Sequence, residues 1–324
     1  MWLVVRRFIF IPLVAAVSGA AIAQEQNPAL DGLRLQGITE YASPRTQGPL
    51  ALAAEAELVL AAKLTEDSPE LPAGLTWRIF APEPGPDGKL PLVASARGGT
   101  SSFKLAPGSY LVHAAYGRAG VTKRIRLGRE SMRERLVLDA GGLKLDAVLP
   151  GDIPIDPNQL RFSIYEAKDA PSSEGQLIVP NVKPDAVVRL NAGTYHVISN
   201  YGPIATIRSD IRVEAGQLTE ATVEHRAAQV TLKLVREPGG EAIADTQWKI
   251  AMTESDRVVF DEVVAHASIV LPEGQYTAVA INRDRTYQRD FTVTVDPKTI
   301  AADGETVIEL LPEDLVQLTD GSSD

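Results

Sequence analysis

The sequence contains no cysteine and only four histidines among its 324 residues. Without cysteine there can be no thiol catalysis, no cysteine-ligated metal site, no disulfide bond and no lipid-modified N-terminal cysteine. Stability must therefore come from burial of the apolar residues, whose share of 44% is that of a globular protein. No His-Glu-x-x-His segment occurs, and no pair stands at ligand spacing among His113, His196, His225 and His266. We expect no metal site and no cofactor.

Other signatures of catalysis are also missing. There is no Gly-x-Ser-x-Gly nucleophile elbow, no phosphate loop and no dinucleotide glycine pattern. The serines in "GGTSS" (98–102) have no partner base in the sequence and resemble a turn that enters a strand. Asp152, Asp156 and Asn158 could offer oxygen ligands to calcium, but their spacing is that of turn residues beside proline. We expect no catalytic residue and no enzymatic activity.

Only the N-terminus carries an extended apolar run. Two arginines precede the apolar stretch 8–20, and small residues up to Ala23 follow it. This order is typical of a secretory signal peptide, residues 1–23. The alternative is an uncleaved anchor, but the run is shorter than the roughly 20 residues that span a bilayer and contains Pro12 and Gly19. We expect cleavage, no later transmembrane segment, and a periplasmic or extracellular protein.

The net charge argues against one class of partner. Removal of the two arginines in 1–23, which contain no acid, lowers the formal net charge from −10 to −12. An acidic chain is not generally attracted to nucleic acid or anionic membranes. Residues 24–53 are rich in turn formers and predict a flexible or partly docked lead-in, and residues 313–324 predict an acidic tail.

A repeat with a period of about 85 residues organises the rest of the chain. "FKLAPGSYLV" (103–112) returns as "VRLNAGTYHV" (188–197) and "IVLPEGQYTA" (269–278), and the three glycines are 85 and 81 residues apart. A second landmark, an aromatic residue followed two positions later by isoleucine, begins at Trp77, Phe162 and Trp248. Two landmarks with matching offsets predict tandem domains at 54–140, 141–227 and 228–312.

Within each repeat the apolar residues alternate with polar ones, as in Phe291, Val293 and Val295. Period two indicates strands with one wet face, and helical periodicity is absent. Six or seven short strands in about 85 residues suit an antiparallel sandwich. The predicted fold is all-β: three tandem immunoglobulin-like or transthyretin-like antiparallel β-sandwich domains.

The recurring motif is interpreted as a folding device. Its leucine ends a strand, its glycine provides a turn conformation, and its tyrosine begins the next strand facing inward. The tyrosine hydroxyl is expected to reach backbone near the sandwich edge, as in a tyrosine corner. The glycine and tyrosine positions are Gly108, Tyr110, Gly193, Tyr195, Gly274 and Tyr276.

This leucine, glycine and tyrosine pattern resembles the turn in carboxypeptidase regulatory-like (transthyretin-like) and PEGA-type sandwich repeats of bacterial envelope proteins. The resemblance covers mainly the second half of each repeat, and the Asp-x-x-Gly turn of the former family is not evident. It implies a β-sandwich with a binding or spacer role and carries no catalytic residue.

One stretch departs from the acidic balance. Residues 118–135, "RAGVTKRIRLGRESMRER", contain seven Lys or Arg against two Glu. Such a patch could receive an acidic partner, an anionic sugar or a lipid headgroup, or could be a solvated face that compensates acidic neighbours. The candidate contacts are Arg124, Arg126, Arg129, Arg133 and Arg135.

Two functions from different classes remain. The first is a non-catalytic exported repeat protein that acts as a spacer, scaffold or protein-interaction module of the cell envelope. The alternative is a carbohydrate-binding accessory protein, for which exposed aromatic residues are needed. Aromatic residues make up only 6% of the chain, and the candidates outside the repeated motif are Tyr116, Tyr201 and Tyr287. The expected partner is an envelope protein or a glycan.

Overall fold

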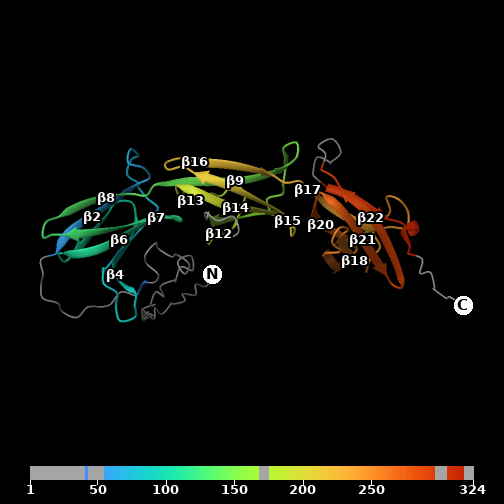
Figure 1. The fold of residues 1–324 in the computed structure, drawn as a ribbon, viewed down its shortest axis with the longest axis horizontal. Helices are drawn as coiled ribbons and strands as arrows, with labels where there is room; N and C mark the ends of the chain where they lie inside the picture. The colour runs from blue at the N-terminus through green and yellow to red at the C-terminus, as the bar shows by residue number, and fades with distance from the viewer. Residues whose placement is uncertain (1–40, 43–54, 168–174, 296–304, 317–324) are drawn as a thin grey trace, which may run out of the picture. The chain divides into compact units, whose positions relative to one another are not determined.

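The computed structural model describes residues 41–42, 55–167, 175–295 and 305–316. Within these ranges the regular structure is β-strand, apart from one turn of 3₁₀ helix, η2 (Pro312–Asp314) (Figure 1). The segment 1–23, most of the lead-in and the end of the tail lie outside the described residues, so signal cleavage stays a prediction. No helix in the described ranges has the length and hydrophobicity that crossing a membrane requires.

The first sandwich is formed by two sheets. The smaller has the strand order β5-β2-β8, and the larger has the order β4-β3-β6-β7 with β1 added beside β4. The strands are β1 (Tyr41–Ala42), β2 (Ala56–Lys63), β3 (Leu75–Phe80), β4 (Leu90–Gly98), β5 (Ser101–Leu105), β6 (Gly108–Tyr116), β7 (Ala119–Leu127) and β8 (Met132–Val137).

The second sandwich has sheets β13-β9-β16, with β10 added beside β9, and β12-β11-β14-β15, while the third has β20-β17-β23 and β19-β18-β21-β22. The second contains β9 (Ala140–Leu149), β10 (Ile153–Pro154), β11 (Leu160–Glu166), β12 (Leu177–Val182), β13 (Val187–Asn191), β14 (Gly193–Tyr201), β15 (Ala205–Val213) and β16 (Leu218–Glu224). The third contains β17 (Ala227–Leu234), β18 (Gln247–Met252), β19 (Val258–Val263), β20 (His266–Pro272), β21 (Gly274–Asn282), β22 (Arg285–Val293) and β23 (Glu305–Leu310).

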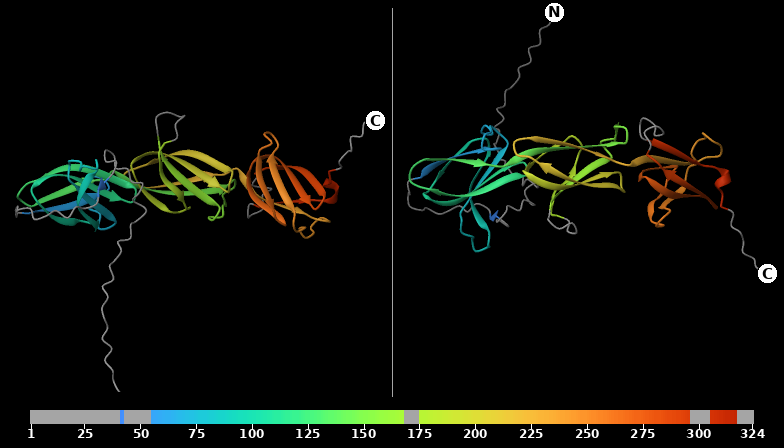
Figure 2. Two further views of the ribbon diagram at one scale, coloured as in Figure 1. Left: turned by 90° about the horizontal axis from the view of Figure 1, so that it is seen from below. Right: turned by 45° about the horizontal axis from the view of Figure 1, so that its top comes forward.

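The three sandwiches share one strand plan. Figure 2 shows each of them as a body of β-strands. This confirms the predicted fold of tandem β-sandwiches. One feature differs from an all-antiparallel arrangement, because the first and last strands of each sandwich pair in parallel: β2 with β8, β9 with β16, and β17 with β23. In each smaller sheet the last strand of the sandwich, β8, β16 or β23, is therefore an edge strand beside β2, β9 or β17.

The second landmark of the repeat forms the centre of each core. The aromatic residue and the isoleucine two positions later lie on one face of a strand, and all six side chains are fully buried. They are Trp77, Ile79, Phe162, Ile164, Trp248 and Ile250. Each pair belongs to a separate cluster of buried apolar side chains, which is why the landmark recurs once per sandwich.

The tyrosine of the motif makes the same hydrogen bond in all three sandwiches. Its hydroxyl donates to the backbone carbonyl four residues earlier, at 2.7 Å for Tyr110, 2.8 Å for Tyr195 and 2.9 Å for Tyr276. Tyr195 and Tyr276 are buried, while Tyr110 is half-buried against the first core. Burial raises the pKa of each tyrosine, so the hydroxyl remains a hydrogen-bond donor.

The motif glycine is the first residue of its strand in all three sandwiches. Gly193 and Gly274 have positive φ angles of +157° and +159°, which residues with a side chain rarely adopt, as the prediction of a costly conformation requires, whereas φ at Gly108 is not positive. At Gly108 and Gly274 the tyrosine ring also lies over the glycine. A Cβ atom at Gly108 or Gly274 would lie 3.7 or 3.6 Å from that ring, so a longer side chain would compete for its place.

Candidate interaction site

The first part of the basic stretch lies on β7. Arg124 and Arg126 are exposed and alternate with the buried Ile125 and Leu127, as the predicted wet face requires. β7 is an edge strand of the larger sheet of the first sandwich. The two guanidinium groups form no ion pair within the described ranges, so this edge presents positive charge to solvent.

The second part of the stretch lies on the other sheet. Arg129 is exposed in the turn after β7, and Arg133 and Arg135 are exposed on β8, an edge strand of the smaller sheet. The outer faces of the two sheets are opposite sides of a sandwich. The arginines of β7 and β8 therefore do not meet in one groove.

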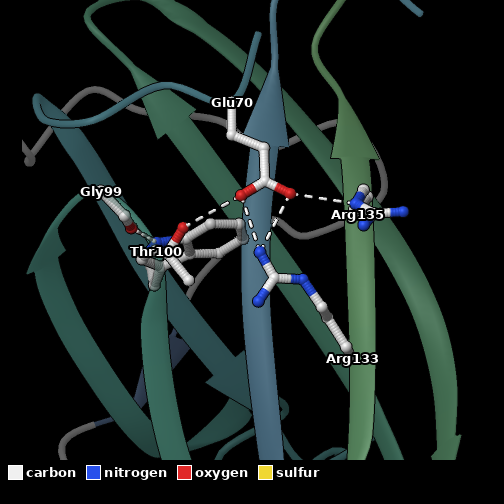
Figure 3. Close-up of polar contacts among 6 residues, drawn as sticks. Glu70, Gly99, Thr100, Arg133 and Arg135 are labelled. Carbon is white, nitrogen blue, oxygen red and sulfur yellow. Dashed lines mark hydrogen bonds and ion pairs between the residues drawn. The ribbon is translucent and has the colours of Figure 1, made fainter.

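Arg133 and Arg135 are already engaged by a carboxylate, Glu70, in the loop between β2 and β3 (Figure 3). The Arg133 Nη2 atom donates to Glu70 Oε1 at 3.0 Å and Oε2 at 2.7 Å, and Arg135 Nε donates to Oε1 at 2.9 Å. The hydrogen bond from Arg133, followed by that from Arg135, lowers the pKa of Glu70. The two arginines of β8 are therefore neutralised by a carboxylate of the same sandwich.

Glu70 was not among the residues singled out from sequence. It lies 63 residues before Arg133, and no local pattern connects the two. The contact exists because β2 pairs in parallel with β8, and because Glu70 forms a bridge back to Lys63 at the end of β2. This pairing is a property of the tertiary fold.

A further ion pair joins the edges of the two sheets. Lys123 Nζ lies 2.6 Å from Glu134 Oε1, and both side chains stand on the core-facing sides of their strands, in line with Ile125 and Leu136. The pair covers the side of the sandwich where β7 and β8 approach each other. Of the cations on the two strands, Arg124 and Arg126 are therefore those that form no ion pair among the described residues.

Ser199 and His225 form a buried pair in the second sandwich. Ser199 Oγ lies 2.7 Å from His225 Nε2, and both residues are essentially inaccessible to solvent. The Tyr201 ring packs edge-on against the imidazole, with 5.9 Å between ring centroids. A serine nucleophile must reach its substrate, and Ser199 is 0% exposed. The pair is part of the core.

Burial lowers the pKa of His225 to about 4, and it does the same for His113, where the charge of Arg78 adds to the effect. The described residues contain no group of three or more His, Cys, Asp or Glu able to hold a metal ion. Because the pKa of each is about 4, His113 and His225 are both neutral at pH 7. They are buried polar residues of the fold.

We expect the stability of the second sandwich to fall on acidification. A histidine in an unfolded chain titrates near pH 6.5, whereas folded His225 titrates at about 4. Between these values the unfolded state binds more protons, so the free energy of unfolding decreases as the pH falls from about 6.5 to about 4. His225→Gln should flatten this dependence in urea unfolding curves recorded by circular dichroism.

His266→Gln, which changes an exposed histidine, provides the control and should retain the full loss of stability. His113 remains in both variants and contributes equally to each. An identical slope for wild type and His225→Gln would contradict the assignment of a lowered pKa to His225.

The aromatic residues proposed as sugar contacts do not form an exposed platform. Tyr201 is only 4% exposed and belongs to the second core, which overturns its interpretation as a surface ring. Tyr116 and Tyr287 are half-buried and pack against the first and third cores. Binding of a sugar by stacking needs an open ring face, and none of the three tyrosines provides a fully exposed one.

Comparison with known proteins gives one family match. Residues 229–300 match the model of the Rhizobiales growth-associated tandem repeat domain. No curated protein sequence matches significantly. The matched family has a different name from the carboxypeptidase regulatory-like and PEGA-type repeats, so that resemblance stays a prediction.

Similar solved structures include two pilins and the Bacillus anthracis TIE protein. A streptococcal ancillary pilin is 12% identical, with 79% of this chain and 98% of that chain covered and a TM-score of 0.33. The Bacillus anthracis TIE protein is 17% identical and covers 80% of this chain, which spans 50% of its length, with a TM-score of 0.24. BcpA, the major pilin subunit of Bacillus cereus, is 11% identical, with 79% and 99% covered and a TM-score of 0.23.

These identities and TM-scores are too low to carry an argument about function. The family match covers most of the third sandwich, and the first two sandwiches have the same strand order. The C-terminal sandwich, through residues 229–300, is thus similar to a Rhizobiales growth-associated tandem repeat domain.

Proposed function

We propose that this chain is a non-catalytic exported protein of the cell envelope that acts as a spacer, scaffold or protein-interaction module. The observation that carries the proposal is the use of the recurring residues. In each sandwich the aromatic and isoleucine landmark is fully buried, and the motif tyrosine donates a hydrogen bond to the backbone carbonyl four residues earlier. The recurring residues therefore stabilise each sandwich, and the exposed residues of the three sandwiches do not have to be the same.

The family match supports this proposal from a second direction. The matched domain is described as a growth-associated tandem repeat, which fits a chain built from repeated sandwiches. The N-terminal sequence 1–23 supports export, to the periplasm or beyond it. The acidic mature chain argues against nucleic acid as the partner.

The surface that we assign to contact with a partner is the exposed edge of β7. Arg124 and Arg126 are exposed there without an ion pair among the described residues, whereas Arg133 and Arg135 are bound to Glu70. An acidic envelope protein is the class of partner that suits this edge, since arginine pairs well with carboxylates. The glycan alternative has less support, since Tyr201 is buried and Tyr116 and Tyr287 are half-buried.

The test is performed with the full chain, tagged at its C-terminus, in its native host. We expect the protein in the periplasmic or extracellular fraction and reproducible recovery of a protein partner by affinity capture at low and moderate salt. Arg124→Glu/Arg126→Glu should reduce that recovery strongly. Retention of the protein in the cytoplasm, or capture that is identical for wild type and variant, would argue against the proposal.

A further inference from the structure

Two edge strands of the larger sheets are each charged with one sign only: β7 is purely basic and β19 is purely acidic. β7 contains Lys123, Arg124 and Arg126 and no acid, while β19 contains Asp261 and Glu262 and no base. The equivalent strands differ from both: β15 and β22 carry both signs, β4, which has β1 beside it, contains one arginine, and β12 has no charged residue. Among these six strands, β7 and β19 are the complementary pair.

The charges of β7 and β19 are also complementary when the outward-facing and core-facing sides of each strand are considered separately. On β19, Asp261 lies opposite the outward-facing Lys249, whereas Glu262 lies opposite the buried Trp248 and shares its core-facing side. On β7, Arg124 and Arg126 face outward and Lys123 faces the core side. If a sheet continued from β7 of one molecule to β19 of another, the sides of the two strands would match. The outward-facing arginines would then lie beside Asp261, and Lys123, which pairs with Glu134 in its own sandwich, would lie on the same side as Glu262.

The two arginines of β7 and the two acids of β19 form no ion pair within the described ranges, whereas Lys123 pairs with Glu134. Asp261 accepts a hydrogen bond of 3.3 Å from Gln247. Acidic edge strands of the smaller sheets are already engaged: Glu220 of β16 pairs with Lys144 at 3.3 Å, and Glu309 of β23 accepts from the Gly239 backbone at 2.9 Å. This selects β19 from the acidic edges.

The edge that corresponds to β19 accepts an extra strand in the first sandwich. There, β1 pairs in parallel with β4, with Tyr41 beside Leu90 and Ala42 beside Pro91. In the second sandwich the equivalent edge, β12, is interrupted by Pro180 and by Asn181 at a positive φ of 53°, features that discourage strand addition.

β19 has no proline and exposes apolar side chains at both ends, Val258 at 41% and Val263 at 65%. It has one neighbouring strand, β18, among the described residues. An edge strand with free backbone groups and exposed apolar residues is suited to pairing with another strand.

We propose that the β7 edge of one molecule pairs with the β19 edge of a second molecule of the same chain. Like charges oppose pairing of β7 with β7 and of β19 with β19, so only the head-to-tail contact is favoured. Such a contact uses two different surfaces and leaves one of each free at the ends, which allows linear assembly. The proposal rests on the assignment of the β7 edge as a contact surface and names a second copy of the chain as its acidic occupant. Asp261→Arg/Glu262→Arg leaves β7 unchanged, so a loss of self-association in this variant is distinguishable from a loss of another partner.

The contact between two short edge strands is small, so we expect weak association that increases with concentration and decreases with salt. Sedimentation velocity of the mature protein at low ionic strength should show a weight-average coefficient that rises with concentration. Arg124→Glu/Arg126→Glu and Asp261→Arg/Glu262→Arg should each weaken association by about tenfold or more, because like charges then face each other.

The decisive sample is an equimolar mixture of the two variants. The acidic β7 of the first variant complements the basic β19 of the second, and the unchanged edges complement each other, so the mixture should associate although neither variant does alone. The matched control is Arg208→Glu/Arg212→Glu on β15, the equivalent edge of the second sandwich, which should associate like wild type. Circular dichroism confirms that all variants are folded.

Three results would overturn the proposal. The first is a wild-type protein that remains monomeric over the whole concentration range at low salt. The second is association of the single-edge variants equal to that of wild type, which would place the contact elsewhere. The third is a mixture of the two variants that stays monomeric while wild type associates.

Discussion

Trp77→Ala is expected to lower the free energy of unfolding of the first sandwich by about 3–5 kcal/mol. Trp77 is fully buried at the centre of this core, and its Nε1 atom donates to the Gly99 carbonyl oxygen at 2.8 Å. Alanine would leave a cavity the size of an indole ring and a carbonyl without its donor. The loss is a large part of the stability of a domain of this size.

Urea unfolding followed by hydrogen exchange and mass spectrometry can assign this loss to one sandwich. Peptides from β3 and β6 should lose protection in the variant, while peptides from β18 and β21 should not change. A general loss of protection in all three sandwiches would show that they unfold together, and a loss below about 1 kcal/mol would contradict the central role of Trp77.

The equivalent tryptophan of the third sandwich provides a matched comparison. Trp248 is equally buried, but its Nε1 atom has no hydrogen-bond partner among the described residues. Trp77→Phe removes a hydrogen bond together with part of the ring, whereas Trp248→Phe removes a buried donor that is not paired. We therefore expect Trp77→Phe to cost more, by about 1 kcal/mol, than Trp248→Phe.

Gly141→Ala is expected to destabilise the second sandwich by about 3 kcal/mol, the upper part of the usual range for overpacking. A Cβ atom at Gly141 would lie only 2.1 Å from the Glu214 carbonyl oxygen and 2.9 Å from that of Gln217. The turn between β15 and β16 cannot withdraw freely. It is held by hydrogen bonds of 2.8 Å from Gly142 N to Gln217 O and from Gly216 N to Ala140 O.

Thermal and urea unfolding, with hydrogen exchange in β9 and β16, measure the effect of Gly141→Ala. The control is Gly128→Ala, because a Cβ atom at Gly128 would have no atom within 4 Å and its φ is not positive. That substitution should change stability by less than about 0.5 kcal/mol. Equal stability of the two variants would show that the close approach of backbone to Gly141 is absent in solution.

The candidate site shows where reasoning from sequence was sufficient and where it was not. Alternation along β7 correctly placed Arg124 and Arg126 on the wet face, since side-chain direction in a strand follows from local geometry. The same reasoning could not show that Arg133 and Arg135 are held by Glu70 or that they lie on the other sheet. Those facts depend on which strands pair across more than 60 residues.

For the recurring motif, too, part of the outcome was predictable from the sequence and part was not. Its spacing was enough to predict three sandwiches and a tyrosine that bonds to nearby backbone, and the hydroxyl does reach the carbonyl four residues earlier in each sandwich. The glycine was expected to adopt a conformation that is costly for other residues in every sandwich, and φ is positive at Gly193 and Gly274 but not at Gly108. Only the backbone angles show this difference between the sandwiches.

By itself, the sequence determined the all-β class, the threefold repetition and the buried landmarks, because period two and recurring spacing are local properties of a chain. The tertiary structure alone decided which charges are neutralised and which stay exposed, why Tyr201 and His225 are interior residues, and which strands form open edges. These outcomes require strand pairing between distant segments, since an ion pair or a buried ring exists only once both partners have been brought together.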